Sequence, residues 1–254
     1  MKALVCAGLL AISSVAQAQS PTAHAPDGGV RQTLQSINVP PLTNAPFTAV
    51  VTTEWTKLLP DGSQATTANR RTIARDSSGR IFEERRYFAP NGDTRETQLS
   101  NLQYMDPNRH EAYDCIPAEK ICYVRPYRRL ALTKMPNNIG GPEACGCGGP
   151  EGGTSVKQEA LGQKTMENVE VVGSREIVTL PVGRFGNDRP EPVVKEFWYA
   201  PRLGLNLIVK RFDPRSGIQN FAVDHVSLSE PDTRMFQPPS DYQVVRAVGP
   251  AGTR

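Results

Sequence analysis

Most of the sequence is a series of strand-like segments separated by short turns, and this pattern limits the possible fold more than any other feature. Residues 50–58, 64–75 and 80–88 are rich in β-branched and aromatic side chains, as strands usually are. The turns that follow them contain the Asp, Asn and Gly residues that adopt positive φ in tight hairpins, at 60–62, 76–79 and 90–93. Because such short connections join antiparallel neighbours, we expect an antiparallel meander.

The same alternation of strands and turns continues through the rest of the chain. In the last strand-like segment, Phe221 and Val223 share one parity while Val226 and Leu228 have the other, which predicts a β-bulge near His225. Strands this long favour one curved sheet over a compact sandwich. We therefore predict a mainly β fold, a long-stranded antiparallel meander that forms an open half β-barrel with one or two short helices. The further strands are expected at 97–105, 110–127, 169–180, 193–199, 205–212 and 218–229.

The N-terminus has the organisation of a secretory signal peptide. Lys2 precedes an apolar run, and residues 16–18 (Ala-Gln-Ala) match the small-x-small pattern of a cleavage site. The apolar run is shorter than the roughly 20 residues that span a bilayer, and no other segment approaches a membrane span. We expect cleavage after Ala18 and a periplasmic or secreted protein with no transmembrane segment in the mature chain.

Pro-rich and Gly-rich segments divide the rest of the chain into regions. The spacing of Val30, Leu34 and Ile37 predicts a short amphipathic helix at 29–38, and a Gly/Pro-rich loop at 131–155 interrupts the strands. Neither side of this loop looks closed by itself, so we expect one β domain. The predicted divisions are a signal peptide at 1–18, a Pro-rich approach at 19–45, a single β domain at 46–245 and a flexible tail at 246–254.

The cysteine count depends on export. Of the five cysteines, Cys6 would leave with the signal peptide, and the remaining even number favours disulfides in an oxidising compartment. Cys115 and Cys122 flank a short turn between two strand-like runs, so we predict a bridge that closes this hairpin. The pairing of Cys145 and Cys147 stays open between a tight ring, bonds to the first pair and a link to another chain. We do not expect these cysteines to have a soft-metal or redox role, because the sequence has no Cys-x-x-Cys motif at the start of a helix.

No set of residues has the pattern of an active site. His24, His110 and His225 are not at metal-ligand spacing, and no Gly-x-Ser-x-Gly or Walker sequence is present. Glu83 and Glu84 are neighbours in a strand and face opposite ways. We therefore expect no catalytic residue, no metal and no cofactor. The 29 Lys and Arg residues are interspersed with 26 Asp and Glu residues, which argues against a nucleic-acid partner.

The large apolar residues of the strands are the candidate ligand-cavity residues. One interpretation is that they form a plain core. The other is that they line a concave sheet able to hold an acyl chain or a similar apolar ligand. They are Trp55, Phe82, Phe197, Trp198, Tyr199, Leu205, Leu207 and Phe221.

Two late segments resemble the periplasmic lipoprotein-carrier superfamily, the LolA-like half-barrels. Residues 196–205 (EFWYAPRLGL) resemble its charged-aromatic strand and Leu-Gly-Leu turn, and residues 236–242 resemble the segment after its last strand. The stretches 186–190 and 213–217 resemble uncharacterised secreted bacterial proteins of that type. The resemblance implies an open half-barrel that binds a ligand without catalysis.

Two functions therefore remain as hypotheses. The first is an exported, non-enzymatic binding protein of the cell envelope that holds a lipid or other apolar small molecule on a concave sheet. The second is an envelope interaction or sensing protein whose 131–155 loop contacts a protein partner.

Overall fold

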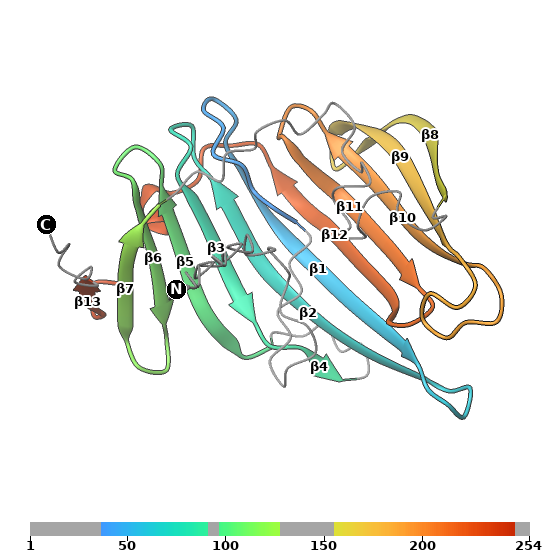
Figure 1. Ribbon diagram of the computed structural model, residues 1–254. Coiled ribbons are helices and arrows are strands. Elements are labelled where there is room, and N and C mark those ends of the chain that lie inside the picture. The colour runs from blue at the N-terminus through green and yellow to red at the C-terminus, as the bar shows by residue number, and fades with distance from the viewer. Residues whose placement is uncertain (1–36, 91–96, 128–154, 247–254) are drawn as a thin grey trace, which may run out of the picture.

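The computed structural model describes residues 37–90, 97–127 and 155–246, and these form one large β-sheet (Figure 1). A 3-10 helix, η2 (Thr233–Phe236), is the single helical element in this part of the chain. The strands are β1 (Phe47–Leu58), β2 (Gln64–Arg75), β3 (Ile81–Arg86), β4 (Ala89–Pro90), β5 (Leu99–Asp106), β6 (Glu111–Ile116), β7 (Ile121–Pro126), β8 (Ser155–Met166), β9 (Val169–Leu180), β10 (Glu191–Ala200), β11 (Leu205–Asp213), β12 (Gly217–Ser227) and β13 (Gln243–Arg246).

The sheet consists of two meanders that meet at its centre. Its order is β13-β7-β6-β5-β3-β2-β1-β12-β11-β10-β9-β8, with β4 beside β2. The first strand, β1, pairs with the last long strand, β12, so segments far apart in sequence are neighbours (Figure 1). All pairings are antiparallel except that of β13 with β7. Because the outer strands β13 and β8 do not pair with each other, the sheet is not closed, and the predicted mainly β, open half-barrel fold is confirmed.

Local sequence signals located most of the hairpins correctly. The predicted bounds of β2 and β9 coincide with the observed ones. Gly79 has a φ of 87° in the turn after β2, where a Cβ would lie 3.4 Å from the Pro41 carbonyl oxygen. The predicted bulge is also present, because Thr48 pairs with Ser227 while Val50 already pairs with Asp224. His225 has a φ of 54° within this bulge.

Residues 110–127 form two strands, β6 and β7, joined by the turn that the sequence predicts between Cys115 and Cys122. Other elements differ from the sequence-based expectation. β8 was missed because its side chains are mostly polar and exposed, which leaves no apolar alternation to detect. β13 was missed because four residues that pair with a distant strand have no local signal. Ser155 is therefore in a strand instead of the loop, and Arg246 is in a strand instead of the tail.

Several predicted segments lie outside the described residues. These are the signal peptide, most of the Pro-rich approach, and the 131–155 loop apart from Ser155. Ile37 and Asn38, the described end of the helix predicted at 29–38, are not helical.

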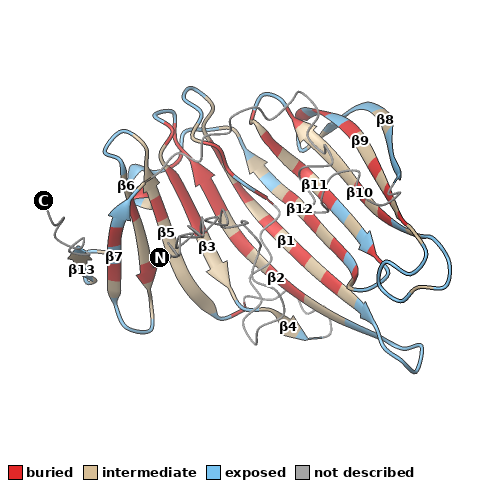
Figure 2. Cartoon of the chain, in the orientation of Figure 1, coloured by how far each residue is buried: buried red, intermediate tan, exposed pale blue. Residues whose placement is uncertain are grey.

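Two faces of the sheet are distinguished by what covers them. The core face contains Phe47, Ala49, Val51, Thr53 and Trp55 of β1, all buried, together with their cross-strand partners. Burial alternates along β1 as period-two alternation requires (Figure 2). Residues 37–46 pack on this face, where Ile37 and Val39 join the main apolar cluster.

The back face has its own, smaller cluster. Phe82 and Tyr104 lie with ring centroids 5.4 Å apart, next to the Cys115–Cys122 disulfide that the sequence predicts. The two cysteines are directly opposite each other on β6 and β7, with Cα atoms 3.9 Å apart. Phe236 of η2 covers this cluster, so the chain after β12 crosses the back of the sheet.

Candidate functional site

The core face brings together five of the eight apolar candidates. Phe221 lies opposite Val209, which in turn lies opposite Phe197, and all three side chains are on this face. Leu205 and Leu207 are buried in the same cluster. Trp55 is on the same face near the far end of β1, where its Nε1 donates a hydrogen bond to the Ser216 carbonyl at 2.7 Å.

The other three candidates do not join this group. Phe82 belongs to the back-face cluster because it pairs with Ala74 and Tyr104, one position out of phase with the core face. Trp198 lies at the register shift of β10 and only packs against the margin of the main cluster; its ring covers Gly173, and its Nε1 donates to Glu196 Oε1 at 2.9 Å. Tyr199 sits beside the register shift between β10 and β11 and is half-buried.

A row of polar side chains crosses the same core face and was not anticipated. We call Gln219, Arg211, Lys195 and Glu176 the polar row, since each lies opposite the next on β12, β11, β10 and β9. We call Phe221, Val209 and Phe197 the apolar row, which lies two residues further along the same strands. A ligand on this face would therefore meet an apolar surface next to a charged one.

Three members of the polar row are buried, the Arg211 side chain is 38% exposed, and the row is incompletely paired. Lys195 Nζ lies 3.7 Å from Glu176 Oε1, and Arg211 Nη2 lies 3.9 Å from Asp213 Oδ2. Both carboxylate oxygens of Glu176 and the Nε of Arg211 are buried without a hydrogen-bond partner in the described part of the chain. Leaving such a group unpaired costs about 1–3 kcal/mol, so the row is suited to a ligand that supplies donors and acceptors.

A second charged group lies nearby on β2 and β3. Arg71 Nη1 is 3.6 Å from Glu83 Oε2, which is also 2.8 Å from Arg85 Nη2. Burial lowers the pKa of Arg71 to about 10 despite the attraction of Glu83. Asn69 Oδ1 and Arg71 Nη1 are buried without a hydrogen bond to any described residue.

A weak sequence signal for these charges exists in retrospect. Lys195 has the parity of Val193 and Phe197, and Arg211 has the parity of Leu207 and Val209. A charge at a core-facing position within an apolar alternation indicates a buried charge. Long-range strand pairing decides which strand lies opposite such a residue, and no local sequence pattern indicates that pairing.

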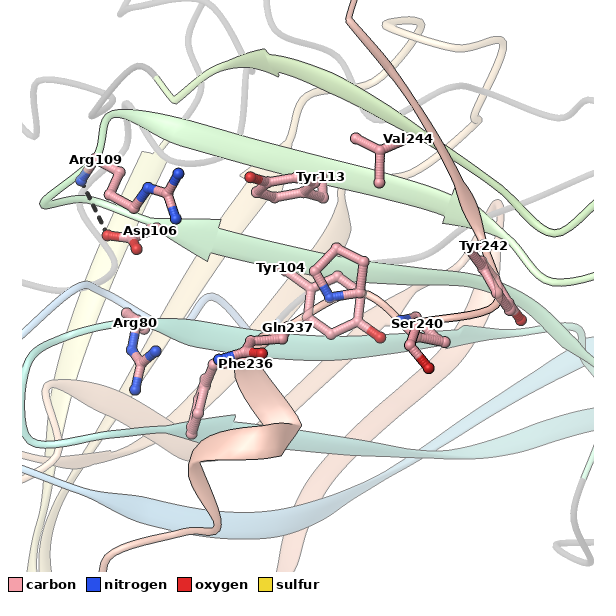
Figure 3. Close-up of a pocket in the computed structure, with 12 residues that line it drawn as sticks. Arg80, Tyr104, Asp106, Arg109, Tyr113, Phe236, Gln237, Ser240, Tyr242 and Val244 are labelled. Carbon is pink, nitrogen blue, oxygen red and sulfur yellow. Dashed lines mark hydrogen bonds between the residues drawn. The ribbon is translucent and has the colours of Figure 1, made fainter.

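A cavity of about 430 Å³ lies on the back face, between the sheet and the chain after β12 (Figure 3). From the sheet it is lined by Arg80, Tyr104, Asp106, Arg109 and Tyr113, and from the opposite side by residues 236–240, Tyr242 and Val244. Neither this cavity nor the course of the segment that covers it was predicted.

The described ranges contain histidines and other residue types that can bind metals. No group of three His, Cys, Asp or Glu residues there is placed to hold a metal ion. His110 is in the turn before β6, and His225 is in the bulge of β12. No helix within the described ranges is long and apolar enough to cross a membrane. His24, Cys145 and Cys147 lie outside these ranges.

Comparison with solved structures finds matches of low identity with TM-scores below 0.5. No family model matches the chain, and no curated protein matches it. An uncharacterised conserved protein from Thermus thermophilus is 11% identical, with 80% of this chain and 90% of that one covered and a TM-score of 0.38. MucB in the MucA/MucB complex of Pseudomonas aeruginosa is 13% identical, with a TM-score of 0.39; 80% of this chain and 58% of that chain are covered.

A domain with a proposed role in outer membrane lipoprotein sorting, from Vibrio parahaemolyticus, is 8% identical. The alignment covers 75% of this chain and 88% of that one, with a TM-score of 0.18. These values assign no ligand and no partner to this chain.

Proposed function

We propose that this protein is an exported, non-enzymatic binding protein of the cell envelope that holds a lipid on the core face, which we take as the concave side of the half-barrel. The observation that carries the proposal is the contact between the apolar row and the polar row on one face of the same strands. An amphipathic molecule needs both surfaces side by side, whereas a plain core needs only the first.

The chemistry of each row suggests how a lipid would lie. Its acyl chain would pack on Phe197, the half-buried member of the apolar row next to the buried Phe221 and Val209, since apolar burial contributes roughly 25 cal/mol per Å². Its polar head would face Arg211 and Glu176, because their buried Nε and carboxylate oxygens lack hydrogen-bond partners among the described residues. A head with both acceptors and donors would pair with both side chains.

Solvent extraction of the purified protein, followed by mass spectrometry, tests this function. We expect a lipid in the extract, or uptake of lipid when vesicles are offered to the emptied protein. Phe197→Gln should lower the bound lipid about tenfold, since losing a buried aromatic contact removes more than 1.4 kcal/mol. Phe212→Gln is the matched control, because Phe212 lies on the neighbouring strand, on the opposite face, and is 36% exposed.

The proposal fails if the protein remains empty after lipid is offered, or if both variants reduce binding equally. Circular dichroism of each variant separates loss of binding from loss of fold.

The location of the protein follows from the N-terminal sequence. We propose that the chain is exported and cleaved after Ala18, on the pattern of residues 16–18. N-terminal sequencing of protein recovered from a periplasmic or culture fraction should begin at Gln19. Recovery of uncleaved protein from the cytoplasmic fraction alone would contradict export.

A further inference from the structure

The cavity on the back face is a fixed part of the fold because the segment above it is anchored at both ends. At one end, Phe236 is buried against the Phe82 and Tyr104 cluster. At the other, the Gln243 backbone N–H donates to the Lys120 carbonyl at 2.8 Å, and Arg246 Nη1 donates to Glu111 Oε1 at 2.7 Å. The chain between these anchors is thereby held above the sheet, and the cavity lies beneath it.

One end of the cavity has two arginine side chains. Arg80 and Arg109 lie on the same side of the cavity, with Asp106, the last residue of β5, between them (Figure 3). Arg80 donates its Nε to Asp76 Oδ2 at 2.6 Å, and its two terminal amino groups have no hydrogen-bond partner among the described residues. Among the described residues the Arg109 guanidinium pairs with Glu111, at 3.5 Å, and its side chain is 67% exposed. Unused guanidinium N–H groups are the usual partners of carboxylates and phosphates.

Three carboxylates accompany these two arginines, because Asp76 pairs with Arg80, Glu111 pairs with Arg109, and Asp106 lines the cavity itself. Asp106 Oδ1 accepts the backbone N–H groups of Asn108 and Arg109, at 2.9 and 3.0 Å, and so caps the turn between β5 and β6. Glu111 accepts Tyr113 Oη at 2.8 Å in addition to Arg246. The groups left to donate to an anion are therefore the terminal amino groups of Arg80 and the exposed guanidinium of Arg109.

The remaining walls of the cavity are formed by aromatic and proline rings. Tyr104 and Tyr113 line the sheet side, and Phe236, Pro238 and Pro239 line the other (Figure 3). Arg80 Cζ lies 5.2 Å from the centre of the Phe236 ring, which holds the guanidinium in place. Aromatic and prolyl surfaces of this kind pack against planar rings.

We propose that this cavity binds a small aromatic anion, with its carboxylate or phosphate between Arg80 and Arg109 and its ring against the tyrosine and proline walls. This site is separate from the core face, and it does not depend on the lipid proposed there. The cavity of about 430 Å³ lies within the size range of small-molecule sites, roughly 300–1,000 Å³.

Isothermal titration calorimetry of the full chain tests the proposal with 4-hydroxybenzoate and phenyl phosphate as probes. We expect at least one of them to saturate a single site, and the tighter of the two identifies the anionic group. Benzamide, which has the ring without the charge, and inorganic phosphate, which has the charge without the ring, should each bind at least about tenfold more weakly.

A pair of matched arginine variants completes the test. Arg109→Gln should weaken binding of the better probe about tenfold. Arg189→Gln should leave it unchanged, because Arg189 is also exposed and pairs with Glu191 two residues on, as Arg109 does with Glu111, but lies away from the cavity. Absence of binding by both anions, equal binding of benzamide, or an equal effect of the two variants would overturn the proposal.

Discussion

At the scale of single residues, Arg75 shows how a buried charge joins distant parts of the chain. Its guanidinium donates to three carbonyl oxygens: Nε and Nη2 to that of Ala45, at 2.9 and 2.7 Å, and Nη1 to those of Pro40 and Leu203, at 2.8 and 2.9 Å. Burial lowers the pKa of Arg75 to about 10. Arg75 thus connects the 37–46 segment to β2 and to the turn between β10 and β11.

Replacing Arg75 with Met should reduce the free energy of unfolding by about 3 kcal/mol or more, because three carbonyl groups lose their donors. Urea unfolding measures the change. Arg189→Met, at an exposed position, is the control and should change stability by less than about 0.5 kcal/mol. Similar stabilities of the two variants would show that Arg75 is not a structural connection.

Tyr104 makes the stability of the back face depend on pH. Burial raises the pKa of its hydroxyl from 10.0 to about 12, so the folded protein retains the neutral form after the unfolded chain ionises. The contribution of the neutral Tyr104 is therefore fully present below pH 10 and is lost as the pH rises to about 12.

The stability of the wild type relative to Tyr104→Phe should consequently fall between pH 10 and pH 12. Urea unfolding of both proteins at several pH values measures this difference. Tyr123→Phe, on the exposed surface of β7, serves as the control. A wild-type curve parallel to that of Tyr104→Phe throughout this range would rule out the proposed burial effect.

At the scale of elements, the hairpins depend on local signals. The turn glycines, the apolar parity and the bulge at His225 were all visible in sequence because a hairpin is made by residues close together in the chain. β8 and β13 lacked such signals. Their backbones pair in the sheet, but their side chains are mainly exposed, so burial left no pattern in their sequences.

The β6–β7 hairpin is additionally closed by a disulfide across a sequence separation of seven residues. Changing both Cys115 and Cys122 to Ala should lower the free energy of unfolding by about 2–3 kcal/mol, since the unfolded chain gains the freedom of an open loop. Urea unfolding of this double variant and of the reduced wild type should give similar losses. An unchanged midpoint in both would contradict a stabilising bridge.

At the scale of the whole molecule, the β1–β12 pairing joins the two meanders into one sheet. The main apolar cluster also crosses this joint, with Phe47 and Val51 from β1 packed in the same cluster as Phe221 and Leu207. Neither meander can bury these side chains alone, so we expect the sheet to fold as a single unit.

The two tryptophans report on different regions and allow a test. Trp55 lies at the β1–β12 joint, and Trp198 lies on β10. Fluorescence of Trp198→Phe and of Trp55→Phe should follow urea transitions that coincide with circular dichroism of the same variant, as cooperative unfolding requires. Two separate transitions within either variant would instead indicate meanders that unfold independently.

The amino-acid sequence by itself determined the strand class, most hairpins, the bulge and the Cys115–Cys122 bridge, because each depends on alternation or turn chemistry within a short stretch. Tertiary structure alone decided which apolar residues share a face, so Phe82 separated from Phe221. It also aligned Glu176, Lys195, Arg211 and Gln219 into one row and created the cavity behind the sheet. Register between strands and the path of a covering segment depend on packing between distant residues, which no local pattern encodes.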